Sequence, residues 1–218
     1  MNERLIKAGE TAEPLDETHV VLQRRDAYRF GSDAVSLYKF ARDAGRMRKE
    51  SHVLDLCSGC GIIGLLAAIE TGARVTGVEL DTVLWDMSVR SAMLNGLDNA
   101  AFINADLKAY APEARFDIVV CNPPFYKSDS KPSGVSPAAN SELTVTFDDA
   151  AACAARSLKS NGCFFVVHTC SRLDEVLGVC GRRKLMPKDL VINRNCKTFM
   201  LKCVKGGKAG LAVRIEEF

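Results

Sequence analysis

Short apolar runs alternate along the chain with longer segments in which apolar residues recur every three or four positions. The runs predict buried strands, and the longer segments predict amphipathic helices between them. The strands are expected over 52–57, 73–80, 100–105, 116–121 and 163–170, and the helices over 33–44, 62–72, 82–96, 146–162 and 171–184. This alternation predicts an α/β fold with an open, mostly parallel sheet and helices on both faces.

The two ends of the chain depart from this regular alternation. Residues 1–48 predict an N-terminal segment of short strands and one helix, and residues 49–218 predict the main domain. Two or three more strand-like runs close the chain, around 190–194, 198–204 and 211–218. Residues 126–141 are rich in Ser, Pro, Ala and Lys, a composition typical of a loop.

The composition is that of a globular protein: 218 residues, 47% of them apolar. No apolar run reaches the roughly 18 residues of a membrane span, and the N-terminus lacks the apolar core of a signal peptide. We therefore expect a cytoplasmic protein without a membrane partner, either a monomer or a weakly associating dimer.

Nine cysteines are scattered through the chain, several of them inside apolar runs. An odd, dispersed set in such a chain favours reduced, buried thiols over disulfides. Cys57 and Cys60 form a C-x-x-C pair, but no second ligand pair stands at zinc-like spacing. We predict no metal site.

The first chemical motif follows the strand at 52–57. The sequence G-C-G-I-I-G, which contains Gly59 and Gly61, matches a dinucleotide-binding fingerprint, and Glu79 stands twenty residues after Gly59. Asp55, however, lies at the end of the strand, where its carboxylate would repel a pyrophosphate. A carboxylate there suits a ligand that carries an ammonium group and no phosphate, such as S-adenosylmethionine.

Acidic residues also follow the next two strands. Glu79 would accept hydrogen bonds from the ribose hydroxyls of that ligand, and Asp106 would take its adenine amino group. The glycines would let the backbone approach the methionine portion closely. Three acidic residues after three successive strands form a more specific pattern than the glycines do.

The fourth strand is followed by C-N-P-P-F-Y-K, in which Asn122 precedes two prolines and an aromatic residue. The prolines end the strand and stiffen the backbone. Asn122 Oδ1 and the Pro123 carbonyl could accept the two N–H groups of an exocyclic amine and so orient its lone pair towards a methyl donor. Phe125 would stack on the base. We predict as catalytic residues Asn122, Pro123, Pro124 and Phe125.

Taken together, these motifs resemble the class I S-adenosylmethionine-dependent methyltransferases, and NPPF is similar to the motif of the branch that methylates amino groups. The segments LQRRDAYRFGSDAVSLYKFAR, MLNGL, VVHTCSRLDEVL and VKGGKAGLAV further resemble bacterial tRNA adenine-N6-methyltransferases, which modify the adenine 3′ of the anticodon in a valine tRNA. The resemblance spans about residues 18 to 215. It implies a Rossmann-like sheet of seven strands, S-adenosylmethionine as cofactor and tRNA as partner.

The same resemblance assigns further residues. It implies that the N-terminal segment packs on the cofactor site and that Phe30 and Asp33 join the pocket. The predicted cofactor-binding residues are Phe30, Asp33, Asp55, Cys57, Gly59, Gly61, Glu79, Leu80, Asp106, Leu107 and Asn122. Cys57 departs from the family, because many relatives have glycine there. The stretch AANSELTV is also less charged than in that family.

Charge is unevenly distributed although the net charge is only +2. Between Arg182 and Arg214 ten basic residues are opposed by Asp189 alone, which favours either a polyanionic partner or a solvated surface. With the resemblance, the loop at 126–141 would contact RNA as well. The predicted nucleic-acid-binding residues are Lys127, Lys131, Arg182, Arg183, Lys184, Arg194, Lys197 and Lys205.

Three alternatives remain from the sequence. Similar N-P-P motifs occur in methyltransferases of release-factor glutamine, of rRNA guanine and of DNA adenine. An NAD-dependent oxidoreductase would explain the glycines but not Asp55 or the NPPF tetrad. A non-catalytic RNA-binding domain would not require the acidic residues and Asn122 together.

Overall fold

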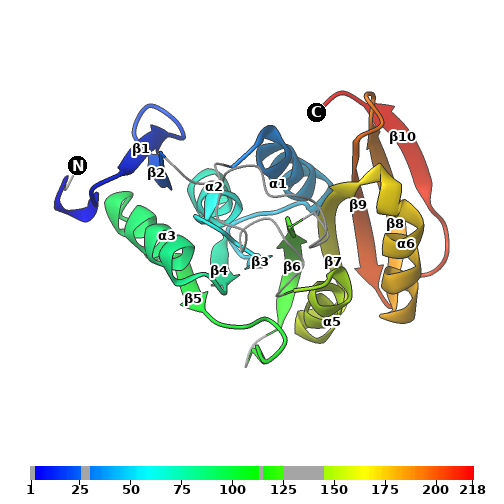
Figure 1. Cartoon of the computed structure of the whole chain (residues 1–218). Coiled ribbons are helices and arrows are strands. Elements are labelled where there is room, and N and C mark those ends of the chain that lie inside the picture. Colours follow the sequence, from blue (N-terminus) through cyan, green and yellow to red (C-terminus); the bar gives the residue numbers. More distant parts are fainter. Residues whose placement is uncertain (1–2, 26–29, 113–114, 125–144) are drawn as a thin grey trace.

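The computed structural model describes residues 3–25, 30–112, 115–124 and 145–218. These residues form an eight-stranded sheet in the order β10-β8-β9-β7-β6-β3-β4-β5 and a separate hairpin of β1 and β2 (Figure 1). The strands are β1 Glu10–Pro14, β2 Val20–Arg24, β3 His52–Leu56, β4 Arg74–Glu79, β5 Ala100–Asn104, β6 Phe116–Cys121, β7 Leu158–Thr169, β8 Leu185–Asn193, β9 Thr198–Lys205 and β10 Ala212–Glu216. The helices are α1 Ser32–Gly45, α2 Ile62–Thr71, α3 Thr82–Leu94, α5 Phe147–Ser157 and α6 Leu173–Arg182, with short 3-10 turns at Glu3–Leu5 and Cys170–Arg172.

The predicted α/β class with a mostly parallel sheet is confirmed. Within the described eight-stranded sheet, only β9 runs antiparallel to both of its neighbours, β7 and β8. The predicted number of seven strands in this sheet is wrong, because the main sheet has eight among the described residues. The additional strand is β10, which pairs in parallel with β8 at the edge of the sheet.

Two apolar layers cover the faces of the sheet. On one face α1, α2 and α3 pack on the strands through a layer that includes Leu37, Leu65 and Phe165. On the other face α5 and α6 pack through a layer that includes Phe147, Val176 and Phe164. Because the central strands are buried on both faces, they read as continuous apolar runs in the sequence.

The helix predicted over 146–162 ends earlier than expected. α5 stops at Ser157, and Leu158 already pairs with Phe116 as the first residue of β7. The register then shifts, so that Cys163 faces Ile118, and Asn161 takes a left-handed conformation with φ of 62°. Pairing with β6 therefore overrides the helical pattern in this segment.

The N-terminal hairpin is attached to α3 by buried charges. Arg90 of α3 donates to both carboxylate oxygens of Glu10 at 2.7 Å and also pairs with Asp86. Only 9% of the Arg90 side chain and 6% of the Glu10 side chain are exposed, so solvent screens this pair weakly. The hairpin is thereby held beside the start of α1, where the chain turns towards the sheet.

The strand order creates a crevice at the carboxyl ends of the parallel strands. After β3 the chain builds β4 and β5 on one side, and then β6 and β7 on the other. Ligands of such sheets bind where the order reverses, which here lies between β3 and β6. Among the described residues, no helix has both the length and the apolarity that crossing a bilayer requires.

Candidate active site

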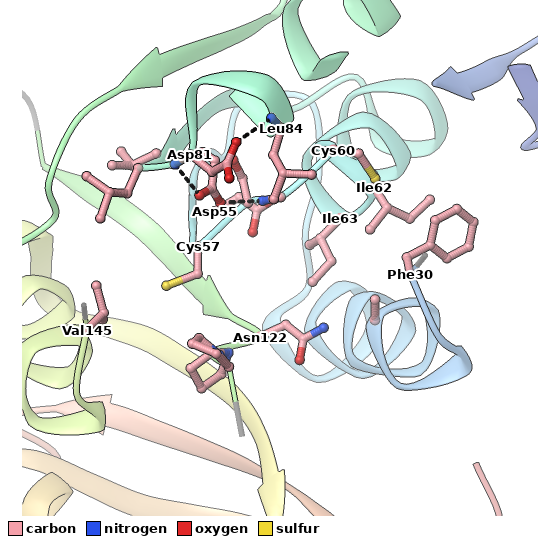
Figure 2. A pocket seen from close by; sticks show the side chains of 18 of the residues that line it. Phe30, Asp55, Cys57, Cys60, Ile62, Ile63, Asp81, Leu84, Asn122 and Val145 are labelled. Atoms are coloured by element: carbon pink, nitrogen blue, oxygen red, sulfur yellow. Dashed lines mark hydrogen bonds between the residues drawn. The ribbon is translucent and has the colours of Figure 1, made fainter. Parts of the chain in front are cut away.

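A cavity of about 480 Å³ opens at this reversal point. The carboxyl ends of β3, β4 and β6, the start of α1 and the loop before α2 all contribute to its wall (Figure 2). The lining residues that the argument uses are Gln23, Phe30, Asp33, Asp55, Cys57, Gly59, Glu79, Asp81, Asn122, Pro123, Pro124 and Val145. The volume is in the range of pockets that hold small-molecule ligands and cofactors.

The loop between β3 and α2 depends on its glycines. Gly59 and Gly61 have φ of 56° and 87°, values that favour glycine. A Cβ on Gly61 would lie 2.9 Å from the Phe102 ring and 2.9 Å from Ser88 Cβ, whereas one on Gly59 would meet no atom within 4 Å. Gly61 is therefore needed for packing, and Gly59 leaves the backbone open beside the cavity.

Asp55 is the buried carboxylate of the site, only 1% exposed. Its Oδ2 accepts a hydrogen bond from the Gly64 amide at 3.0 Å, while no described residue donates to Oδ1. Burial raises the pKa of Asp55 to about 7. A cationic group in the cavity would offset the cost of desolvating this carboxylate, which fits the ammonium group of S-adenosylmethionine.

Glu79 connects the glycine loop to the next helix. Its Oε2 accepts from the Gly59 amide at 2.7 Å and its Oε1 from the Asp81 amide at 2.9 Å. Burial raises the pKa of Glu79. Asp81 in turn caps α3 by accepting from the amides of Val83 and Leu84. The carboxylate at the end of β4 is thus held in place by two backbone amides.

The charge of the cavity wall is negative. Asp33, Asp55, Glu79 and Asp81 line it, and burial raises the pKa of Asp33 as well. Of the described residues that line the cavity, none is Lys, Arg or His. A wall of this kind favours a ligand with positive charge and disfavours a pyrophosphate, which is an argument against the NAD-dependent alternative.

Asn122, Pro123 and Pro124 follow β6 and enter the same cavity from the other side of β3. They arrive there because Cys121, the last residue of β6, is paired with Leu56, the last residue of β3. Phe125 lies outside the described residues. The predicted methyl-donor and amine-orienting motifs therefore share one cavity.

The other predicted cofactor residues are placed as follows. Phe30, Asp33, Cys57, Leu80 and Leu107 line the cavity. Asp106 is not among the lining residues, although its neighbours Ala105 and Leu107 are. Its carboxylate accepts from the Lys108 amide at 2.9 Å and pairs with Lys108 Nζ at 3.5 Å. Its role towards adenine stays a prediction.

Among the wall residues that sequence reasoning missed, Gln23 and Val145 come from segments without a motif. Gln23 is 3% exposed, and its side chain accepts a hydrogen bond from the Phe30 amide at 3.2 Å. Val145 lines the cavity and directly precedes the capping box of Thr146 and Asp149 at the start of α5. A polar residue within the run VVLQR was the available signal for Gln23, and Val145 carried none.

The predicted nucleic-acid-binding residues do not form one cluster. Lys197 and Arg194 lie in the turn between β8 and β9. Thr198, at the start of β9, pairs with Thr169 at the end of β7, so this turn lies at the carboxyl ends of the parallel strands, the edge that also holds the cavity. Lys184 and Lys205 lie at the opposite edge, where the Gly206 amide donates to the Lys184 carbonyl. Arg182 and Arg183 precede Lys184, and Arg183 pairs with Asp148. Lys127 and Lys131 lie outside the described residues.

A protein-family model described as methyltransferase small domain matches residues 40–174. Among curated proteins, the chain is 30% identical over 168 residues to a tRNA1(Val) (adenine(37)-N6)-methyltransferase of Dickeya chrysanthemi, covering 74% of this chain and 65% of that protein. A protein of the same description from Klebsiella pneumoniae is 30% identical over 154 residues, 67% of this chain and 61% of the relative. The chain thus spans slightly less than two thirds of the length of these relatives.

A third relative has a different substrate in its name. The ribosomal protein uL3 glutamine methyltransferase of Bradyrhizobium diazoefficiens is 30% identical over 98 residues, 44% of this chain and 30% of that protein. Among solved structures, one described as a predicted O-methyltransferase from Agrobacterium tumefaciens has a TM-score of 0.65 at 20% identity, covering 85% of this chain and 86% of the other. A putative class I S-adenosylmethionine-dependent methyltransferase from Listeria monocytogenes has a TM-score of 0.63 at 14% identity, covering 90% and 67%. These structures support the fold.

Replacing Gly61 by alanine should destabilise the protein more than replacing Gly59. Gly61→Ala combines an unfavourable positive φ with a clash against the Phe102 ring, and we expect a loss of about 2–4 kcal/mol in the free energy of unfolding. Gly59→Ala has the backbone strain alone and should lose about 1–2 kcal/mol. Urea denaturation of both variants measures this difference. Equal losses would show that the ring of Phe102 moves aside freely.

Replacing Asp55 by asparagine should stabilise the protein at neutral pH. Since the folded pKa is raised from 3.8 to about 7, the wild-type protein loses stability as pH rises from about 4 to 7, and the full cost, on the order of 4 kcal/mol, is present above pH 7. The introduced amide carbonyl would still accept from the Gly64 amide. We expect Asp55→Asn to be more stable than wild type at pH 8, with the difference shrinking towards pH 4. Denaturant titrations at both values test this, and a difference independent of pH would contradict it.

Proposed function

The chain belongs to the methyltransferase small domain family, and we propose that it methylates N6 of an adenine in tRNA with S-adenosylmethionine as methyl donor. The observation that supports this most strongly is the shared cavity. In it, a carboxylate-lined wall without basic residues among those described meets the rigid Asn122-Pro123-Pro124 segment. The names of the Dickeya and Klebsiella relatives supply the substrate, adenine 37 of a valine tRNA.

The residues present fit the methyl donor. Asp55 would hold the ammonium group through Oδ1, to which no described residue donates a hydrogen bond. Glu79 would hold the ribose, and the open side of Gly59 would accommodate the methionine portion. When bound, S-adenosylmethionine supplies a methyl group activated by a sulfonium. Phe30 and Asp33 would close the pocket from the N-terminal segment.

The Asn122 segment would orient the target amine. The exocyclic amine of adenine is a poor nucleophile, because its lone pair is delocalised into the ring. Asn122 Oδ1 and the Pro123 carbonyl accept one N–H each, and this fixes the direction of the lone pair. The two prolines hold both acceptors in place, so the contribution is orientation and no general base is required.

The proposed RNA surface includes the basic residues predicted from the sequence. These residues lie at two opposite edges of the sheet, and the two edges are not equivalent. The target base must enter at the carboxyl edge, and the turn with Arg194 and Lys197 lies at that edge. Both residues are exposed. We place them against phosphates near the target base, with Arg182 and Lys184 farther away.

Asn122→Ala tests the function directly. We expect methyl transfer to fall by at least about a hundredfold because the amine is no longer oriented, while the affinity for S-adenosylmethionine changes by less than about threefold. Transfer of a labelled methyl group to total RNA, followed by nucleoside analysis for N6-methyladenosine, measures the first effect. Calorimetry measures the second, with NAD as the control that should give no heat. Label recovered in protein glutamine instead of RNA would contradict the tRNA substrate.

Charge reversal at the two edges tests the RNA surface. Arg194→Glu with Lys197→Glu should weaken tRNA binding by at least about tenfold. The slope of log K against log salt concentration should also fall, by the amount that corresponds to the loss of about two phosphate contacts. Arg182→Glu with Lys184→Glu carries the same change in charge and serves as the matched control, with a smaller effect. Filter binding across a range of salt concentrations gives both quantities. A larger effect from the control pair would place the RNA on the opposite edge.

A further inference from the structure

The two cysteines of the C-x-x-C motif do not face one another. Cys60 packs in the apolar layer formed by α1, α2 and α3, whereas Cys57 packs against the layer formed by α5 and α6. Figure 2 shows their sulfur atoms on different sides of the cavity. The motif visible in the sequence is therefore not the thiol pair that the fold creates.

Cys57 instead meets Cys121. Cys57 directly follows β3, and Cys121 ends β6 beside Leu56, so the two residues lie at the tips of neighbouring strands. A strand continuing at position 57 would point its side chain to the opposite face. Cys57 has φ of 56°, and this left-handed conformation turns its side chain onto the face where Cys121 is buried.

Cys57 and Cys121 pack in the same apolar layer at the ends of neighbouring strands. The Cys57 thiol is the largest cause, ahead of burial, of the raised pKa of Cys121. Neighbouring strands lie about 4.8 Å apart, and a disulfide spans a Cα separation of about 4.4–6.8 Å, so cysteines at adjacent strand tips fall in the range that a disulfide can join. Strand register and packing in one layer therefore make Cys57 and Cys121 the candidate pair.

Of the two cysteines, only Cys57 can be reached from the cavity. Cys57 is partly exposed and lines the cavity, and its sulfur lies on the side of Asn122 and Val145 (Figure 2). Cys121 is completely buried. A small oxidant in the cavity would therefore reach Cys57 first and Cys121 only through it.

We propose that Cys57 and Cys121 form a peroxide-sensitive disulfide site that closes the methyl-donor cavity. The Cys57 sulfur attacks hydrogen peroxide, forming an S–O bond as the O–O bond breaks, and the Cys57 thiol proton goes to the departing hydroxide, which leaves as water. The Cys121 sulfur then attacks the Cys57 sulfur. The S–S bond forms as the S–O bond breaks, the Cys121 proton goes to the departing oxygen, and a second water leaves.

Closure follows from the position of both residues. Cys57 belongs to the loop that carries Gly59, and Cys121 directly precedes Asn122. Shortening a thiol contact to a disulfide bond draws the sulfurs together by about 1.5 Å. This movement would shift the cofactor loop and the amine-orienting segment towards each other and narrow the cavity between them.

Peptide mapping without reductant tests the site in the full-length protein. After limited treatment with hydrogen peroxide we expect one cross-linked peptide pair containing Cys57 and Cys121, absent in Cys57→Ser and in Cys121→Ser. Cys180 and Cys203 form the internal control, because the Cys180 thiol likewise raises the pKa of Cys203, but both residues are fully buried and neither lines the cavity. Cross-linking of that control pair first, a Cys57–Cys60 or Cys57–Cys153 bond, or over-oxidation of Cys57 without a cross-link would overturn the proposal.

A second measurement tests closure and rests on the proposed function. Oxidised protein should bind S-adenosylmethionine at least about tenfold less tightly by calorimetry, with affinity restored by dithiothreitol, and saturating S-adenosylmethionine should slow the cross-linking. Cross-linking without any change in affinity would refute closure. If reduced wild-type protein gives no heat with S-adenosylmethionine, the proposed function fails, whereas the mapping of the disulfide is judged on its own.

Discussion

The site depends on one energetically costly constraint, the burial of the Asp55 carboxylate at the end of β3. The fold gives this group one amide donor, from Gly64, and leaves its second oxygen without a donor among the described residues. Burial raises its pKa to about 7, so the carboxylate is only partly ionised near neutral pH. A cation in the cavity would restore the charged form, which links cofactor binding to the stability of this loop.

The glycine loop and the Asn122 segment meet because of strand order. They are separated by more than sixty residues in the sequence, yet β3 and β6 are hydrogen-bonded neighbours and end at the same level. Glu79 fixes the third side of the cavity through the amides of Gly59 and Asp81. The reversal of strand order between β3 and β6 is thus what turns separate motifs into one site.

Several features could not be predicted because they depend on contacts between distant segments. The basic residues from 182 to 205 look continuous in the sequence, but the β8–β9 hairpin carries them to opposite edges of the sheet. Arg183 and Lys205 also bind partners within the chain, Asp148 and the Leu158 carbonyl. Val145 and Gln23 enter the cavity from segments without a motif. The residue-level roles at the site stay predictions.

The sequence by itself determined the alternation of strands and helices and the class of the sheet, and it singled out Asp55, Glu79 and Asn122 as candidate site residues. These follow from local causes: apolar period, glycine and proline conformations, and the charge that a ligand must complement. Only the tertiary structure decided that β10 adds an eighth strand, that α5 ends at Ser157 and that Cys57 faces Cys121 instead of Cys60. Each of these depends on which strand edge or sheet face a residue meets in the folded chain. Pairing between segments far apart in the sequence produces no periodic pattern of apolar residues from which it could be predicted.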